Sequence, residues 1–173
     1  MKQTMVVFLL VLAATAAFAA APASPVAPLG YFVGKWQCSG TAYAMEKMPE
    51  HATAGTVNAS WTMNGHWVAF TYAETKSAAN AHPFSVGGFM GFDAQQKAFV
   101  MGGVDSMGGY STEAGPWQGN TLTLTGPWHM NGTTMTSRDT FVKKSESQMT
   151  HSAEIEQGGK WIKAAQETCN RQK

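Results

Sequence analysis

The sequence predicts a single all-β domain, an antiparallel meander β-barrel of about ten strands. Its 173 residues leave room for one domain and not for two. Charged residues make up only 13% and Gly is abundant at 18 residues, a composition that argues against disorder and against helical bundles. No stretch shows convincing helical periodicity, and turn signals separate runs rich in Val, Phe, Thr, Tyr and Trp. These signals are Asn64-Gly65, Asp93–Gln96, Gln118–Asn120, Asn131-Gly132 and Gly158-Gly159.

The chain begins with the three-part pattern of a secretory signal peptide. Lys2 supplies the basic start, residues 6–17 form an apolar run, and Ala17-Phe18-Ala19 fits the small-x-small cleavage pattern. A membrane span needs about 20 apolar residues, which this run does not reach. We therefore expect a periplasmic or secreted protein with a signal peptide over residues 1–19, a flexible leader over 20–30 and a barrel over 31–173.

The charge balance gives no sign of a charged partner. The formal net charge is +1, and removal of Lys2 leaves 11 basic and 11 acidic residues. Because no more than two basic residues are adjacent, we expect no nucleic-acid binding and no stable membrane anchor after cleavage. We expect a monomer.

The two cysteines, Cys38 and Cys169, lie near the two ends of the mature domain. Export favours a disulfide between them. The alternatives are a redox site or a metal site, but the sequence has neither a C-x-x-C motif nor a Cys/His cluster. On the chain-entropy model, a bridge that closes so long a loop contributes roughly 4–5 kcal/mol to stability.

Two tight turns predict which side chains face the barrel interior, because a two-residue turn fixes the register of its hairpin. Asn64-Gly65 pairs Met63 with His66, and Asn131-Gly132 pairs Met130 with Thr133. The first hairpin then has an apolar side, which we expect to be the interior: Val57, Ala59, Trp61, Met63, His66, Val68, Phe70 and Tyr72. The inner set of the second is Leu122, Leu124, Trp128, Met130, Thr133, Met135, Ser137, Asp139 and Phe141.

Asp139 is the one ionisable residue of that second inner set, and a lone buried carboxylate is costly unless it is paired. If Lys144–Glu146 is a three-residue loop, Phe141 faces Met149 and Asp139 faces His151. Directly opposed residues have Cβ atoms about 4.5–5.5 Å apart, close enough for a hydrogen bond. An inward Asp139–His151 pair is one interpretation, and a solvated Asp139 with a separate His151 is the other.

The last hairpin extends this register. Gly158-Gly159 pairs Ile155 with Ile162, which places His151 opposite Gln166. The same register turns three side chains to the outside of the barrel: Trp161, Glu167 and Cys169.

Several motifs resemble a known family. The opening Leu29–Gly40 contains a G-x-W pattern that resembles the first strand of lipocalin-like and nitrobindin-like barrels. Further motifs are similar to the exported bacterial proteins of domain-of-unknown-function family 1579: Gly65-His66-Trp67, Gly88-x-x-Gly91-Phe92-Asp93, Val104–Tyr110 and Glu167–Arg171. The resemblance covers nearly the whole mature chain. It implies a lipocalin-like barrel and export, but no activity or catalytic residue.

We expect no cofactor. Catalytic and nucleotide-binding motifs are absent from the sequence. Nine Met residues of the mature chain and five His residues suggest copper, but the His residues lie on different segments without ligand spacing. The nitrobindin-like resemblance suggests haem binding as an alternative. Haem needs an axial ligand, and His151 is the one inward candidate near the C-terminal strands.

Three functions are compatible with these sequence features. A barrel of about eight or more strands can enclose one small ligand, so a pocket and a filled core both remain open. The leading hypothesis is binding of a small, mostly apolar molecule. The alternatives are an acid–base enzyme that uses His151 and Asp139, and an envelope interaction module with a packed interior. The predicted ligand-binding residues are Trp61, His66, Phe70, Tyr72, Asp139, Phe141, His151 and Gln166, and catalytic residues stay unknown.

Overall fold

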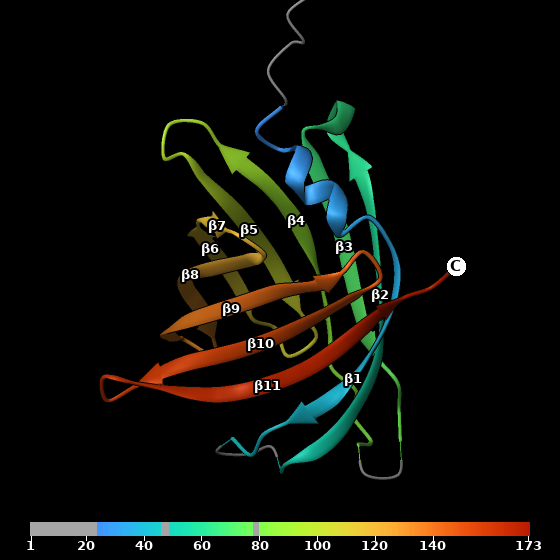
Figure 1. The fold of residues 1–173 in the computed structure, drawn as a ribbon. Coiled ribbons are helices and arrows are strands. Elements are labelled where there is room, and N and C mark those ends of the chain that lie inside the picture. The colour runs from blue at the N-terminus through green and yellow to red at the C-terminus, as the bar shows by residue number, and fades with distance from the viewer. Residues whose placement is uncertain (1–23, 46–48, 78–79) are drawn as a thin grey trace, which may run out of the picture.

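The computed structural model describes residues 24–45, 49–77 and 80–173. The predicted signal peptide lies outside them. The described residues form two short 3-10 helices, η1 (Ala27–Tyr31) and η2 (Met63–Gly65), neither of which is long enough to cross a membrane. Eleven strands follow one another along the chain (Figure 1): β1 (Gly34–Ala42), β2 (His51–Thr62), β3 (Trp67–Glu74), β4 (Ser85–Asp93), β5 (Ala98–Asp105), β6 (Tyr110–Gly115), β7 (Trp117–Gln118), β8 (Thr121–Met130), β9 (Thr133–Ser145), β10 (Gln148–Gln157) and β11 (Lys160–Arg171).

The strands form one closed antiparallel sheet. Neighbours in the sheet are mostly neighbours in sequence, and β1 pairs with β11 to join the two ends of the chain. The barrel closes through pairing of β6 with β8, while the two-residue β7 adds only a short edge to β8. The predicted all-β barrel of about ten strands is therefore confirmed.

Both tight-turn registers agree with the sequence prediction. Trp61 lies opposite Val68 and Met130 lies opposite Thr133, as the two turns require. The first ladder ends one pair before Met63, because Met63–Gly65 forms η2. Asn64 adopts a left-handed backbone conformation there, with φ of 57°, which Asn tolerates better than most residues.

Two irregularities make the register of the C-terminal strands differ from the prediction. The ladder skips Lys144, so Lys143 and not Phe141 lies opposite Met149, and the predicted three-residue loop is wrong. In β11 the ladder skips Ala164, a β-bulge that shifts the remaining pairs by one residue. His151 therefore lies opposite Glu167 instead of Gln166. Glu167 and Cys169, which the sequence turned outward, are instead buried, at 7% and 2% exposure.

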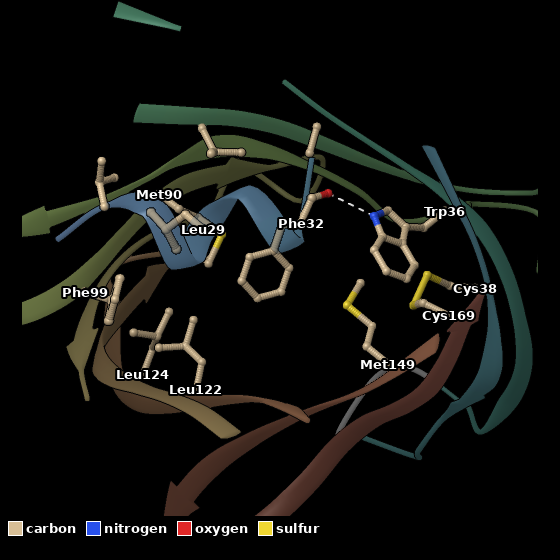
Figure 2. Packing of buried hydrophobic residues seen from close by; sticks show 13 residues of the cluster. Leu29, Phe32, Trp36, Cys38, Met90, Phe99, Leu122, Leu124, Met149 and Cys169 are labelled. Carbon is tan, nitrogen blue, oxygen red and sulfur yellow. Dashed lines mark hydrogen bonds between the residues drawn. A yellow bond between two sulfur atoms is a disulfide. The ribbon is translucent and has the colours of Figure 1, made fainter. Parts of the chain in front are cut away.

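One end of the barrel is filled by η1 and the residues beside it (Figure 2). Leu29 and Trp36 are fully buried, and the indole of Trp36 donates a hydrogen bond to the Phe32 carbonyl. Leu122, Leu124, Met90 and Phe99 pack in the same cluster. Since Val26 and Leu29 belong to this cluster, the second half of the leader predicted to be flexible is part of the folded domain.

We expect Leu29→Ala to lower the free energy of unfolding by about 3 kcal/mol, because the side chain is fully buried and its removal leaves a cavity. Urea denaturation followed by Trp fluorescence measures this change. A loss below about 1 kcal/mol would show that η1 is only loosely attached to the barrel.

The disulfide joins Cys38 of β1 to Cys169 of β11, two directly opposed residues at the seam between the first and last strands. This confirms the predicted pairing. Its position is different from the prediction, since both sulfurs lie inside the barrel next to Met149 and Trp36 (Figure 2).

Candidate functional site

The barrel interior changes from apolar to polar along its axis. The end filled by η1 is apolar, whereas the middle and the opposite end contain buried or partly buried acidic side chains. Glu74, Glu113 and Glu167 are each less than one-tenth exposed. Buried carboxylates are costly unless they are paired or hydrogen bonded, so their partners define the chemistry of this layer.

Asp139 and His151 form the centre of the polar layer. The two residues are diagonal neighbours on β9 and β10, and Nε2 of His151 lies 2.5 Å from Oδ1 of Asp139. The His151 ring stacks on Phe141 at a centroid distance of 4.6 Å, which fixes its orientation. Although both side chains face the interior, Asp139 and His151 keep 18% and 22% of their side-chain surface accessible. Part of each side chain is therefore accessible to solvent.

The charge of His151 is stabilised by this arrangement. Burial alone would lower the pKa of His151, but the hydrogen bond and charge of Asp139, with the charge of Glu167, raise it above its ordinary value. The Asp139 carboxylate thus favours the protonated form of the His151 imidazole.

Glu113 adds a second carboxyl group beside Asp139. Oγ of Ser137 donates a hydrogen bond to its Oε1 at 2.5 Å, while Oε2 is buried and has no hydrogen-bond partner among the described residues. Burial, and then the charge of Asp139, raise the pKa of Glu113 to about 9. Glu113 is therefore protonated at neutral pH, next to the charge of Asp139.

A glycine in β8 lets Glu113 approach Ser137 across the intervening strand. A Cβ atom on Gly126 would lie 2.0 Å from the Thr112 carbonyl oxygen and 2.9 Å from Cα of Glu113. Any side chain at position 126 would separate β6 from β9 at this level. Gly126 is thus a requirement of the site.

Glu167 lies on the other side of His151. The hydroxyl groups of Thr53 and Tyr72 both donate to its Oε1 at 2.8 Å. Tyr72 reaches it by lying over Gly55, where a Cβ atom would come within 2.5 Å of the tyrosine ring. Burial and the charge of Glu167 raise the pKa of Tyr72, so this hydroxyl stays a donor.

A second histidine–carboxylate pair stands farther along β2 and β3. Nε2 of His51 lies 3.1 Å from Oε1 of Glu74, whose other oxygen accepts from the Asn80 amide and the Phe84 backbone N–H. His51 Nδ1 also lies 3.1 Å from the Pro49 carbonyl. Since all of these bonds hold loop residues to the barrel, the pair has a structural role.

The predicted site residues divide into two groups. Phe70, Tyr72 and Phe141 pack against the buried core and accompany Asp139 and His151. Trp61, His66 and Gln166 do not join them: Trp61 is 39% exposed, and His66 and Gln166 are on the surface. His66 is exposed because it closes the turn after η2, and Gln166 because the bulge at Ala164 turns Glu167 inward in its place.

Sequence reasoning missed Glu113, Glu167 and Thr53. Glu113 lies on β6, which follows a four-residue turn, Ser106–Gly109, and not one of the two-residue turns that fix a register directly. The only sequence signal for these residues is the presence of glycines inside strands, which allow side chains from neighbouring strands to meet.

We expect Asp139→Asn to lower the pKa of His151. The amide still accepts the hydrogen bond but no longer supplies the charge that opposes the effect of burial. NMR titration of the imidazole protons measures the shift. The control is Glu154→Gln, since Glu154 pairs with Arg138 across β9 and β10 away from this cluster. An unchanged His151 titration in Asp139→Asn would contradict the proposed source of the shift.

Candidate metal ligands are few among the described residues. Nε2 of His151 is bound to Asp139, so Nδ1 is the ring nitrogen of His151 left for another partner. Among the described residues, the one group with metal-ligand spacing is Cys38, Glu167 and Cys169, and its two sulfurs form the disulfide. Two surface depressions, one beside Gly34 and one beside Tyr110, contain no carboxylate.

The comparisons with known proteins agree with this architecture. The model of the family described as "Protein of unknown function (DUF1579)" matches residues 21–171. The chain belongs to this family. No curated protein matches the chain.

For this DUF1579 member, one similar solved structure is that of Rv2717c from M. tuberculosis, with a TM-score of 0.66 and 14% identity over 88% of this chain and 99% of the other. At this identity the likeness shows the fold alone, a barrel. A redesigned β-barrel is also similar, with a TM-score of 0.46 and 14% identity over 83% of this chain and 94% of the other.

Proposed function

We propose that this DUF1579 protein is an exported binding protein that takes a small, mostly apolar molecule into its barrel. The main observation in support is that Asp139 and His151 face the interior and yet keep 18% and 22% of their side-chain surface accessible. The ligand's apolar part lies along Phe70, Tyr72 and Phe141, and its polar end bonds to the Asp139–His151 pair.

Small side chains support a pocket at this level. Ala153 and Ala165 are directly opposed on β10 and β11, and Ala153 also lies opposite Asp139. Larger residues there would fill the space beside the carboxylate. Proteins that bind small ligands commonly combine such apolar walls with a few polar groups that fix orientation.

The disulfide supports the exported part of the proposal. Cysteines in reducing compartments remain thiols, whereas Cys38 and Cys169 are joined. The expected compartment is the periplasm or the exterior.

The proposal is tested by titration with N-phenyl-1-naphthylamine, a neutral apolar dye that fluoresces when it is bound away from water. We expect saturable binding that Ala153→Phe reduces at least tenfold, because the new ring occupies the interior. The matched control is Ala54→Phe, since Ala54 is exposed on β2. No saturable binding by the parent protein, or equal binding by both variants, would overturn the proposal and favour a packed envelope module.

A second candidate is an acid–base enzyme in which Asp139 holds His151 as the base. The observation that favours it is the protonated Glu113 beside the pair, which supplies an acid and a base within one site. Under this function, His151→Ala abolishes a screened hydrolase or isomerase activity and leaves thermal stability nearly intact. Unchanged turnover in His151→Ala would remove this candidate.

A further inference from the structure

The polar layer contains more acidic groups than cations. Asp139 and Glu167 act on the imidazole of His151, and Glu113 lies beside Asp139. The basic side chains of the described residues are elsewhere: every Lys except Lys143 is exposed. Lys143 bonds to Glu146, and Arg138 bonds to Glu154. Arg171 stacks on Trp36 at the end filled by η1. The layer is therefore short of at least one positive charge.

The missing positive charge matters most at Glu113. This residue is only 4% exposed, and its Oε2 has no donor among the described residues. A buried carboxylate with an unpartnered oxygen is strongly unfavourable, so the protein keeps a proton there. That proton takes the place of a cation that the described residues do not supply.

We propose that the polar end of the ligand is a protonated amine, held by the carboxyl groups of Glu113 and Asp139 in place of the proton that Glu113 holds. This inference rests on the proposed function and names its ligand class. An ammonium group provides three N–H donors, enough for both carboxylates, and its bonds to them are charge-assisted. The apolar part of the amine lies beside Phe141, whose ring contacts His151.

The exchange releases one proton. When the ammonium group enters, the O–H bond of Glu113 breaks, its proton passes to solvent, and the carboxylate accepts an N–H bond from the ligand. The amine keeps its own proton. Calorimetry in two buffers of different ionisation enthalpy measures this release, and we expect close to one proton per amine bound at pH 7.

Three ligands of equal chain length test the inference: octylamine, 1-octanol and octanoic acid, each displacing N-phenyl-1-naphthylamine at pH 7. We expect octylamine to bind at least tenfold more tightly than 1-octanol, and octanoic acid to bind most weakly. Equal affinities, or tighter binding of the acid, would overturn the amine inference but leave the proposed function standing. Dye binding that no ligand displaces would overturn the amine inference, and absence of dye binding would overturn both.

A pair of variants assigns the effect to Glu113. In Glu113→Gln, which keeps the shape of the side chain, we expect the preference for octylamine over 1-octanol to fall below threefold and the proton release to disappear. Glu156→Gln is the control, because Glu156 is exposed on β10, and it should retain both the preference and the release. A tenfold amine preference in Glu113→Gln would overturn the assignment.

Discussion

Glu113→Gln is expected to stabilise the protein at alkaline pH and to flatten its pH–stability profile. The folded state raises the pKa of Glu113 from 4.5 to about 9, first through burial and then through the charge of Asp139. Between these values the folded protein holds a proton that the unfolded chain has released. Stability therefore falls as pH rises, by about 1.4 kcal/mol for each pH unit. From pH 5 to pH 8 the loss amounts to about 4 kcal/mol.

The amide of Gln does not titrate and still accepts the bond from Ser137, so the variant lacks this loss. Urea denaturation at pH 5 and pH 8 measures both profiles. His151 contributes a slope of the same sign. Its folded pKa is raised, so its stabilisation is present below its ordinary pKa and is lost as pH rises through the folded value. Equal slopes for the parent protein and Glu113→Gln would show that the carboxyl group is ionised in the fold.

Removal of the disulfide is the other change with a large expected effect. Cys38 and Cys169 are 131 residues apart, so their bond restricts nearly the whole unfolded chain. We expect the double variant Cys38→Ala with Cys169→Ala to lose about 4 to 5 kcal/mol of unfolding free energy. The backbone pairing of β1 with β11 would then close the barrel without a covalent link.

Denaturation with and without a reductant measures this loss. The two sulfurs are buried, so the folded parent protein should resist reduction and become sensitive only as it unfolds. The control is Asn170→Ala, next to Cys169 but exposed, which should leave the midpoint nearly unchanged. If the double variant had the parent's midpoint, the bond would not stabilise the closed barrel.

The sequence was sufficient to predict the barrel, the disulfide and two hairpin registers. The two registers could be predicted because Asn64-Gly65 and Asn131-Gly132 are strong local turn signals. The sequence also predicted the Asp139–His151 contact, although the length predicted for the loop between β9 and β10 was incorrect. The register error was two residues, and an even shift keeps both side chains on one face. The bulge at Ala164 was an odd shift with no glycine or proline to mark it, so Glu167 and Cys169 were assigned to the wrong face.

The interior position and the raised pKa of Glu113 could not be predicted from the sequence, for a different reason. Its interior position depends on β6 pairing with β8, a contact that closes the barrel and has no local sequence signal. Its pKa depends on Asp139, which lies two strands away. Such properties arise only when the whole sheet is closed.

The extra residue in β11 has a consequence for how this lineage of proteins can change. The single backbone step at Ala164 sets the orientation of both Glu167 and Cys169 relative to the final hairpin. Deletion of that one codon would leave a regular ladder with the same pairs from Ala165 onward, so both side chains would stay inside. Straightening the strand with the residue retained would turn both side chains outward together, so a descendant that has lost the bulge but not the residue should have lost the acidic group and the crosslink as a unit.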